Sequence, residues 1–297
     1  DGQGDAGKMN AIDIEKIIAE SEEELSAQFK ALEKIAYSNQ CRVMEAFQKS
    51  KIALRHFAAS SGYGYGDEGR DTLNALFADI FGAEAALVSP NILSGTHALT
   101  VGLFGLLRTG DTLFSVSGNP YDTLQEVIGG KDIGSLADFG ISFKKCELKN
   151  GDFDTDAIRE GLSDRTVKVV FIQRSRGYEW RDALSEEKIR KICSFVRSCG
   201  FTGCIFVDNC YGEFVETSEP TQNGADICVG SLIKNPGGGI APTGGYIVGK
   251  REYVDKIAGR LTAPSIGAEV GSYAYGYQYF YEGVFLAPHV VCQALKG

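Results

Sequence analysis

Residues 204–239 of the chain read CIFVDNCYGEFVETSEPTQNGADICVGSLIKNPGGG, a stretch with two apolar runs that each lead to chemically active side chains. The run at 204–207 is followed by Asp208, and the run at 226–229 leads to Lys234. Short apolar runs of this kind predict buried strands of a parallel sheet. Because ligands of such sheets bind beyond the carboxyl ends of the strands, we expect Asp208 and Lys234 to face one site.

On both sides of this stretch, the chain alternates between candidate strands and candidate helices. Strands are expected at 112–116, 140–147, 167–172, 203–207, 226–229 and 245–248, and helices at 70–81, 95–107, 154–161, 185–199 and 250–260. This alternation predicts an α/β fold with a mostly parallel sheet between helices. Helical spacing of apolar residues before position 59 predicts an N-terminal helical arm. The expected units are an arm at 1–59, a sheet domain at 60–270 and the start of a helical region at 271–297.

Composition and charge exclude several classes of protein. The 297 residues carry 30 Lys and Arg against 39 Asp and Glu, a net charge of −9, which argues against nucleic-acid or anionic-membrane partners. The eight cysteines show neither a C-x-x-C pair nor metal-finger spacing, so we expect buried thiols, a reducing compartment and no metal. The N-terminus lacks a signal-peptide core and the longest apolar run is too short to span a bilayer. These features predict a cytoplasmic protein.

Two further stretches complete a chemical pattern. The stretch Ser94-Gly95-Thr96 opens an apolar helix, whose N-terminus is an anion-binding position, and Tyr121 follows another strand. A lysine, an acid, an aromatic ring and a phosphate-binding helix terminus at separate strand ends are what pyridoxal phosphate requires. Each feature also has an ordinary explanation, since Ser94 could simply cap its helix and Asp208 could simply belong to a turn.

Four stretches carry a resemblance to a known family. They are YGYGDEGR at 63–70, SGTHA at 94–98, VDNCYGEF at 207–214 and SLIKNPGGG at 231–239. With them the chain, from about residue 12 to its end, resembles the methionine gamma-lyase family that includes the aluminium resistance proteins. The resemblance implies the large domain of an aspartate-aminotransferase-like (fold type I) enzyme that depends on pyridoxal phosphate, near the enzymes of cysteine and methionine metabolism.

The resemblance also implies roles for single residues. Lys234 would bind the cofactor covalently, Asp208 would pair with its pyridine nitrogen and Tyr121 would stack on its ring. The residues expected to hold the phosphate are Ser94, Gly95, Thr96 and Ser231.

Other residues are given shared or open roles. Tyr63, Tyr65 and Arg70 would reach the phosphate of a neighbouring subunit, which implies a homo-oligomer, a dimer or tetramer with shared active sites; alternatively they only decorate a loop. One residue of the segment 173–176 could touch the phenolic oxygen of the cofactor. His97 could contact the cofactor or merely fill the first turn of its helix.

The implied activity is that of a carbon–sulfur lyase acting on a sulfur amino acid. Lys234, with its pKa lowered by desolvation, would remove the α-proton, and β- or γ-elimination would release a thiol, a 2-oxo acid and ammonia. The alternatives are an aminotransferase, a γ-replacement enzyme or a non-catalytic oligomer that binds the cofactor. Fold type I enzymes normally continue into a small domain that supplies the arginine for the substrate α-carboxylate. The chain ends at Gly297 with no sheet after its last helical stretch, so we expect either that the chain is a fragment or that the small domain is absent.

Overall fold

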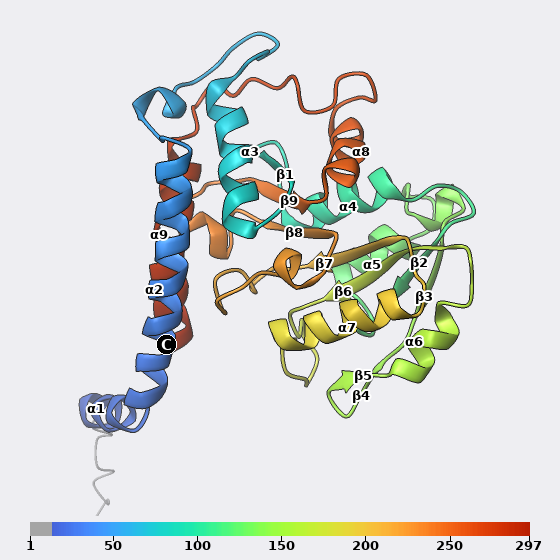
Figure 1. Ribbon diagram of the computed structural model, residues 1–297, viewed down its shortest axis with the longest axis horizontal. Coiled ribbons are helices and arrows are strands. Elements are labelled where there is room, and N and C mark those ends of the chain that lie inside the picture. Colours follow the sequence, from blue (N-terminus) through green and yellow to red (C-terminus); the bar gives the residue numbers. More distant parts are fainter. Residues whose placement is uncertain (1–13) are drawn as a thin grey trace, which may run out of the picture.

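The computed structural model describes residues 14–297 and contains a seven-stranded sheet in the order β1-β9-β8-β7-β6-β2-β3 (Figure 1). The strands are β1 (Ala85–Ser89), β2 (Thr112–Ser115), β3 (Ser142–Lys145), β6 (Val167–Gln173), β7 (Cys204–Asp208), β8 (Ile227–Ser231) and β9 (Gly245–Gly249). The neighbouring strands β8, β7, β6, β2 and β3 pair in parallel, whereas β9 pairs antiparallel with both β8 and β1. A separate two-stranded hairpin joins β4 (Leu148–Lys149) to β5 (Asp152–Phe153).

Helices cover both faces of the sheet. The α-helices of residues 14–297 are α1 (Ile14–Glu24), α2 (Ser26–Lys49), α3 (Glu68–Phe81), α4 (Gly95–Leu106), α5 (Asp122–Gly129), α6 (Thr155–Gly161), α7 (Glu186–Ser198), α8 (Arg251–Leu261) and α9 (Gln278–Lys296). Short 3₁₀ helices lie at η1 (Leu54–Phe57), η2 (Ala137–Phe139), η3 (Pro220–Asn223) and η4 (Asn235–Gly237). Apolar side chains of α4, α5 and α8 pack on one face. On the other face, α6 and α7 cover the parallel half, and α2, α3 and α9 cover the antiparallel half.

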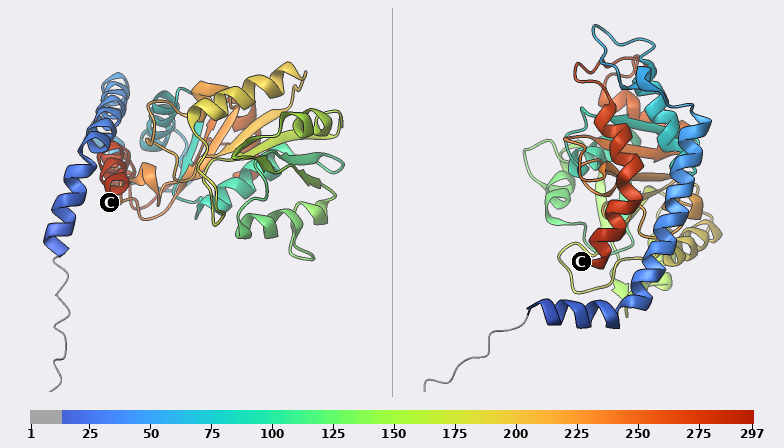
Figure 2. Two further views of the ribbon diagram at one scale, coloured as in Figure 1. Left: turned by 90° about the horizontal axis from the view of Figure 1, so that it is seen from below. Right: turned by 90° about the vertical axis from the view of Figure 1, so that its left-hand side faces the viewer.

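The N-terminal arm and the C-terminal helix lie side by side. Figure 2 shows α2 running along α9 at the edge of the body, with α1 projecting from the end of α2. None of the described residues of α1 is buried. The predicted helical arm is therefore present from residue 14, while residues 1–13 lie outside the described residues.

The sheet confirms the predicted α/β class and differs from it in detail. All six predicted strands form, but β1 was not expected, and neither were α5 or the β4–β5 hairpin. β9 pairs antiparallel with β8, and the link between them, residues 232–244, contains only the short 3₁₀ helix η4 and no α-helix of the kind that usually makes a parallel crossover. The carboxyl ends of β6, β7 and β8 meet at one edge, since Gln173 aligns with Asp208 and Asp208 aligns with Val229.

Candidate active site

Lys234 lies just beyond β8, where the chain turns back toward β9. Its Nζ sits 4.2 Å from the centroid of the Tyr211 ring. The glycines that follow allow another helix to approach, because a Cβ on Gly238 would overlap the carbonyl oxygen of Gly283 in α9. Gly238 also adopts a φ of +56°, which glycine tolerates best. Lys234 thus lies next to the Tyr211 ring and at the start of a turn that packs closely against α9.

The helix terminus predicted to bind phosphate lies against Lys234. A Cβ on Gly95, the first residue of α4, would lie 3.0 Å from Cys210 Sγ, 3.6 Å from Ser231 Cβ and 3.7 Å from Lys234 Nζ. Ser94 caps this helix, and its Oγ accepts a hydrogen bond of 3.1 Å from the N–H of His97. The first N–H groups of a helix have no acceptor within it, so this end offers donors beside the amine.

Asp208 is the buried acid of the site. It is 1% exposed, and its Oδ1 accepts a hydrogen bond of 3.1 Å from the N–H of Cys210. Burial raises the pKa of Asp208, while hydrogen bonds from Cys210 and the charge of Lys234 act in the opposite direction. The Cys210 thiol interacts with both Asp208 and Lys234, and burial raises its own pKa well above the usual value. Cys210 therefore acts as a neutral thiol between the acid and the amine.

The expected lowering of the lysine pKa is wrong for this structure. Burial does lower the pKa of Lys234, but the neighbouring Cys210, Tyr211 and Asp208 outweigh it and the net direction is upward. Of these neighbours, Asp208 carries the formal negative charge of the site when ionised. The ammonium form is the one that this environment stabilises.

Tyr121 contacts the N-terminal turn of α4 through Thr96. Its hydroxyl lies 2.9 Å from Thr96 Oγ1, and its N–H donates to Gln173 Oε1 at 2.8 Å. Burial raises the pKa of Tyr121 to about 12, opposed by the hydrogen bond with Thr96 and supported by the charge of Asp208. The phenol is therefore neutral near pH 7, and Gln173 holds its backbone.

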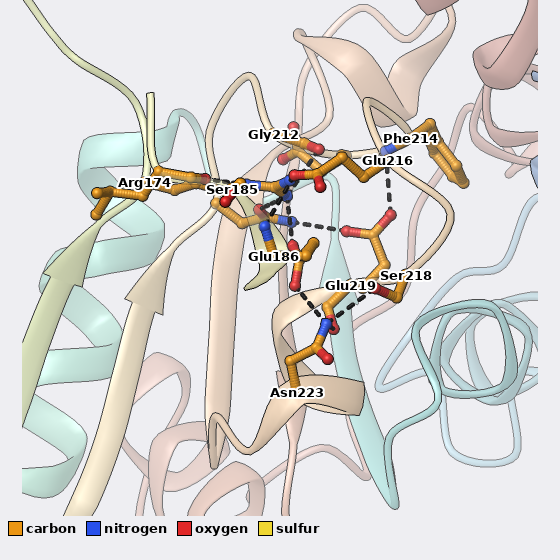
Figure 3. Close-up of polar contacts among 12 residues, drawn as sticks. Arg174, Ser185, Glu186, Gly212, Phe214, Glu216, Ser218, Glu219 and Asn223 are labelled. Atoms are coloured by element: carbon orange, nitrogen blue, oxygen red, sulfur yellow. Dashed lines mark hydrogen bonds and ion pairs between the residues drawn. The ribbon is translucent and has the colours of Figure 1, made fainter. Parts of the chain in front are cut away.

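Arg174 is committed to a buried ion-pair network and is not free to bind a ligand (Figure 3). It is 3% exposed and pairs with Glu186 at 2.8 Å and Glu216 at 2.9 Å. It also donates to Asn209 Oδ1 and to the carbonyl of Gly212, both at 2.8 Å. The network holds the loop that follows Asp208 in place.

His97 points into a different cavity. Its Nδ1 accepts a hydrogen bond of 3.1 Å from the N–H of Leu93, and the ring lines a cavity of about 200 Å³ together with Arg70. Both interpretations of His97, contact with the cofactor or filling of the first helical turn, stay open.

Tyr63, Tyr65 and Arg70 lie apart from Lys234 in this single chain. The two tyrosines are 79% and 68% exposed. Arg70 is buried and donates to the carbonyl oxygens of Gly64 at 2.9 Å and Glu269 at 3.3 Å. It ties its own loop down, and a role at a neighbouring subunit stays a prediction.

The residues gathered at this edge fit pyridoxal phosphate. Gly95 leaves space where a Cβ would crowd the Cys210 thiol beside Lys234, and the helix terminus and the Thr96 hydroxyl supply donors. The buried Asp208 interacts electrostatically with Lys234. Ser231 is fully buried at the end of β8. Cys210 and Tyr211 were not expected here, although both stand in the 207–214 stretch; only the fold reveals that they meet Lys234.

Two other kinds of site were sought in the described part of the chain. Between residues 14 and 297 no three His, Cys, Asp or Glu side chains are placed to hold a metal ion. Over the same residues no helix is both long and apolar enough to cross a membrane.

Comparisons with known proteins agree with this architecture. The uncharacterized protein YnbB of Bacillus subtilis (strain 168) is 48% identical over 288 residues, which make up 96% of this chain and 68% of that protein. A solved carbon-sulfur lyase involved in aluminum resistance from Clostridium novyi NT is 47% identical, with a TM-score of 0.91, and the match covers 95% of this chain and 68% of that one. The pyridoxal-5'-phosphate dependent protein YhfS from Escherichia coli is 18% identical with a TM-score of 0.65, over 86% of this chain and 65% of that one, and shares the fold.

The family model for methionine gamma-lyase matches residues 14–297, essentially all that the structure describes. Its match takes in the helix terminus at Gly95, the acid Asp208 and the lysine Lys234. The chain therefore belongs to the methionine gamma-lyase family.

Proposed function

We propose that the chain is a carbon–sulfur lyase that depends on pyridoxal phosphate and acts on a sulfur-containing amino acid. The observation that carries the proposal is the position of Lys234 Nζ. It lies beside the N-terminus of α4 at Gly95 and interacts electrostatically with the buried Asp208. The family match and the similar lyase from Clostridium novyi support this reaction class.

Each residue has a distinct part in this reaction. When bound, the cofactor supplies an electron sink for negative charge that develops at the substrate α-carbon. Lys234 Nζ, once it has lost a proton, takes the α-proton from the substrate. Asp208 would accept a hydrogen bond from the pyridinium N–H of the bound cofactor, and the N-terminus of α4 with Thr96 and Ser231 would hold its phosphate. Breaking the bond from sulfur to the β- or γ-carbon then releases a thiol.

We also propose that the protein is a cytoplasmic homo-oligomer. Support for assembly comes from the loop that carries Tyr63 and Tyr65, whose two rings stand 6.0 Å apart and are largely exposed. Large aromatic side chains are enriched at subunit interfaces.

Covalent capture of the cofactor tests the proposal first. The protein is mixed with pyridoxal phosphate, its visible spectrum is recorded and borohydride is added. The wild type should be yellow and should retain the cofactor covalently, whereas Lys234→Ala should retain none. Lys131→Ala, an exposed lysine, is the matched control and should behave as the wild type. A colourless wild type that captures nothing would refute the proposal.

Release of a 2-oxo acid tests the reaction itself. With L-cystathionine or L-methionine, a lyase releases 2-oxo acid through many turnovers. A reaction that stops after one turnover would indicate an aminotransferase, and cofactor capture without any turnover would indicate a binding protein.

A further inference from the structure

The Tyr211 side chain lies against the amine of Lys234. Lys234 Nζ stands over the ring at 4.2 Å from its centroid, within the distance of about 6 Å at which the face of an aromatic ring attracts a cation. The ring is 61% exposed, so it does not serve to fill the core. Among residues 14–297 its hydroxyl has no hydrogen-bond partner and the ring pairs with no other aromatic ring. Within that range the amine of Lys234 is therefore the specific partner of Tyr211.

The backbone at Tyr211 adopts a conformation that tyrosine rarely takes. Its φ is +69°, in the left-handed region that favours glycine. Hydrogen bonds hold this turn, since the N–H of Gly212 donates to the carbonyl of Asn209 at 2.7 Å and Arg174 donates to the carbonyl of Gly212 at 2.8 Å (Figure 3). Strained residues that are held in this way cluster at functional sites. The turn after Asp208 thus accepts backbone strain in order to place a ring against the amine.

Other charged or titratable groups face the same amine from neighbouring elements. The N-terminus of α4 carries a partial positive charge, which repels an ammonium. Burial raises the pKa of Cys210 well above its usual value and the pKa of Glu213 to about 8, so both side chains are mainly uncharged near pH 7. Asp208 attracts the ammonium when it is ionised, but the proposed function assigns its carboxylate to the pyridinium of the bound cofactor. Of these groups, the Tyr211 ring holds the ammonium without engaging a group that the cofactor needs.

A lysine in this position needs a partner because its side chain is mobile. The amine stands on a flexible four-carbon stem and is strongly hydrated when charged, so it favours water over a fixed position. Lys234 is only partly buried, which leaves water within its reach. In the proposed reaction the amine is free whenever the substrate occupies the cofactor, and it must return to the same carbon to complete the cycle. A ring beside the site keeps the amine close to that carbon.

We propose that Tyr211 is a positioning residue whose ring holds the ammonium of Lys234 beside the N-terminus of α4 whenever this amine is not bound to the cofactor. The inference rests on the proposed function, because it takes Lys234 as the residue that captures the cofactor. The face of the ring makes the contact, and the hydroxyl has no part in it. Phenylalanine should therefore replace tyrosine, whereas leucine, which is apolar but has no ring, should not.

Competitive acetylation tests the contact in the full chain before pyridoxal phosphate is added. Acetic anhydride reacts with the uncharged form of an amine, so mass spectrometry of the Lys234 peptide across a range of pH gives the pH at which half of this amine is uncharged. Tyr211→Leu should lower that midpoint by about half a pH unit, because the ammonium loses the ring. Tyr211→Phe should keep the midpoint of the wild type, and the exposed Lys131 should give one midpoint in every sample. An unchanged midpoint in Tyr211→Leu, or an equal shift in Tyr211→Phe, would overturn the proposal.

The rate of cofactor capture tests whether the ring positions the amine. Pyridoxal phosphate is added, and the rate at which the visible absorbance grows is divided by the fraction of uncharged Lys234 that acetylation gives at the same pH. This corrected rate should fall about threefold in Tyr211→Leu, because the amine is no longer held where the cofactor arrives. Tyr211→Phe should match the wild type, and so should Tyr178→Leu at an exposed tyrosine.

The outcomes separate this inference from the proposed function. An unchanged corrected rate in Tyr211→Leu would refute the positioning role of Tyr211 alone. Failure of borohydride to fix the cofactor in the wild type would instead refute the proposed function, and the acetylation midpoints would still decide whether the ring holds the ammonium.

Discussion

At the scale of a residue, the proposed role of the buried Asp208 in cofactor binding can be tested by removing its charge. Asp208→Asn keeps the shape of the side chain and removes its charge, so the pyridine N–H loses a charge-assisted hydrogen bond worth about 1.5–3 kcal/mol. We expect the affinity for pyridoxal phosphate to fall by about 10- to 100-fold, as measured by titration of the visible absorbance. Asp255→Asn, on the exposed side of α8, should bind the cofactor as the wild type does. If Asp208→Asn bound pyridoxal phosphate with the affinity of the wild type, Asp208 would not contact the cofactor.

Glu213 makes stability depend on pH. It is fully buried, its Oε1 accepts a hydrogen bond of 2.7 Å from the Tyr246 hydroxyl, and its Oε2 has no partner among the described residues. Burial raises the pKa of Glu213 from 4.5 to about 8. Between these values the folded protein holds a proton that the unfolded chain has lost. Stability is therefore largest below pH 4.5 as far as this group is concerned, and it falls as pH rises toward 8.

The free energy of unfolding should drop by about 1 kcal/mol between pH 7 and pH 8 because of this group. Urea unfolding at the two pH values measures the difference. Glu213→Gln should largely abolish it, whereas Glu45→Gln, at an exposed position of α2, should keep it. An unchanged difference in Glu213→Gln would show that Glu213 is already ionised at pH 7.

At the scale of an element, the N-terminus of α4 is capped by Ser94 and is the proposed binding position of the phosphate. Gly95→Ala places a Cβ 3.0 Å from Cys210 Sγ, a crowded contact that pushes the thiol or the helix end out of position. We expect cofactor affinity to fall about tenfold, equivalent to about 1.4 kcal/mol, by absorbance titration. Gly129→Ala, at the end of α5, enters open space and should leave affinity unchanged. An unaffected Gly95→Ala would mean that the phosphate does not approach this turn.

Elements with a strong periodic pattern could be predicted from the sequence, and short ones could not. The strands β7 and β8 are apolar runs bounded by polar residues and glycine, and both form as expected. β1 is a five-residue apolar strand that follows α3 after only three residues, and its partner β9 lies about 160 residues later, so no local signal separates it from a buried helix. α5 has only two buried residues, Leu124 and Ile128, too few for a periodic pattern.

The candidate site shows the same limit. Lys234, Asp208 and the 94–96 turn could be found because each stands at a strand or helix end within a recognisable stretch. The contacts of Cys210 and Tyr211 with Lys234 depend on how two separate loops pack. Neither composition nor spacing reports such a contact.

At the scale of the whole molecule, Arg70 joins distant parts of the chain. Its guanidinium bonds to the carbonyl oxygens of Gly64, Glu269 and Gly271, so it fastens the loop before α3 to the segment before α9. Arg70→Ala leaves these acceptors without a donor and should lower the free energy of unfolding by about 2–3 kcal/mol. Thermal unfolding and limited proteolysis of residues 61–66 measure the effect. Arg190→Ala, on the exposed face of α7, is the control. An unchanged free energy of unfolding in Arg70→Ala would show that these contacts do not stabilise the fold, and would leave the predicted role of Arg70 at a neighbouring subunit.

The distance along the chain between Gly95 and Lys234 has a consequence for biosynthesis. A ribosome makes the helix terminus proposed to bind phosphate well before the lysine, and Asp208 is made between them. The nascent protein can therefore hold the anion end of the cofactor only weakly until β8 and its turn have left the exit tunnel and paired with β7. If Lys234 binds the cofactor as proposed, covalent capture requires that β8 and the turn after it have already folded against β7, so capture would report that this part of the sheet is complete.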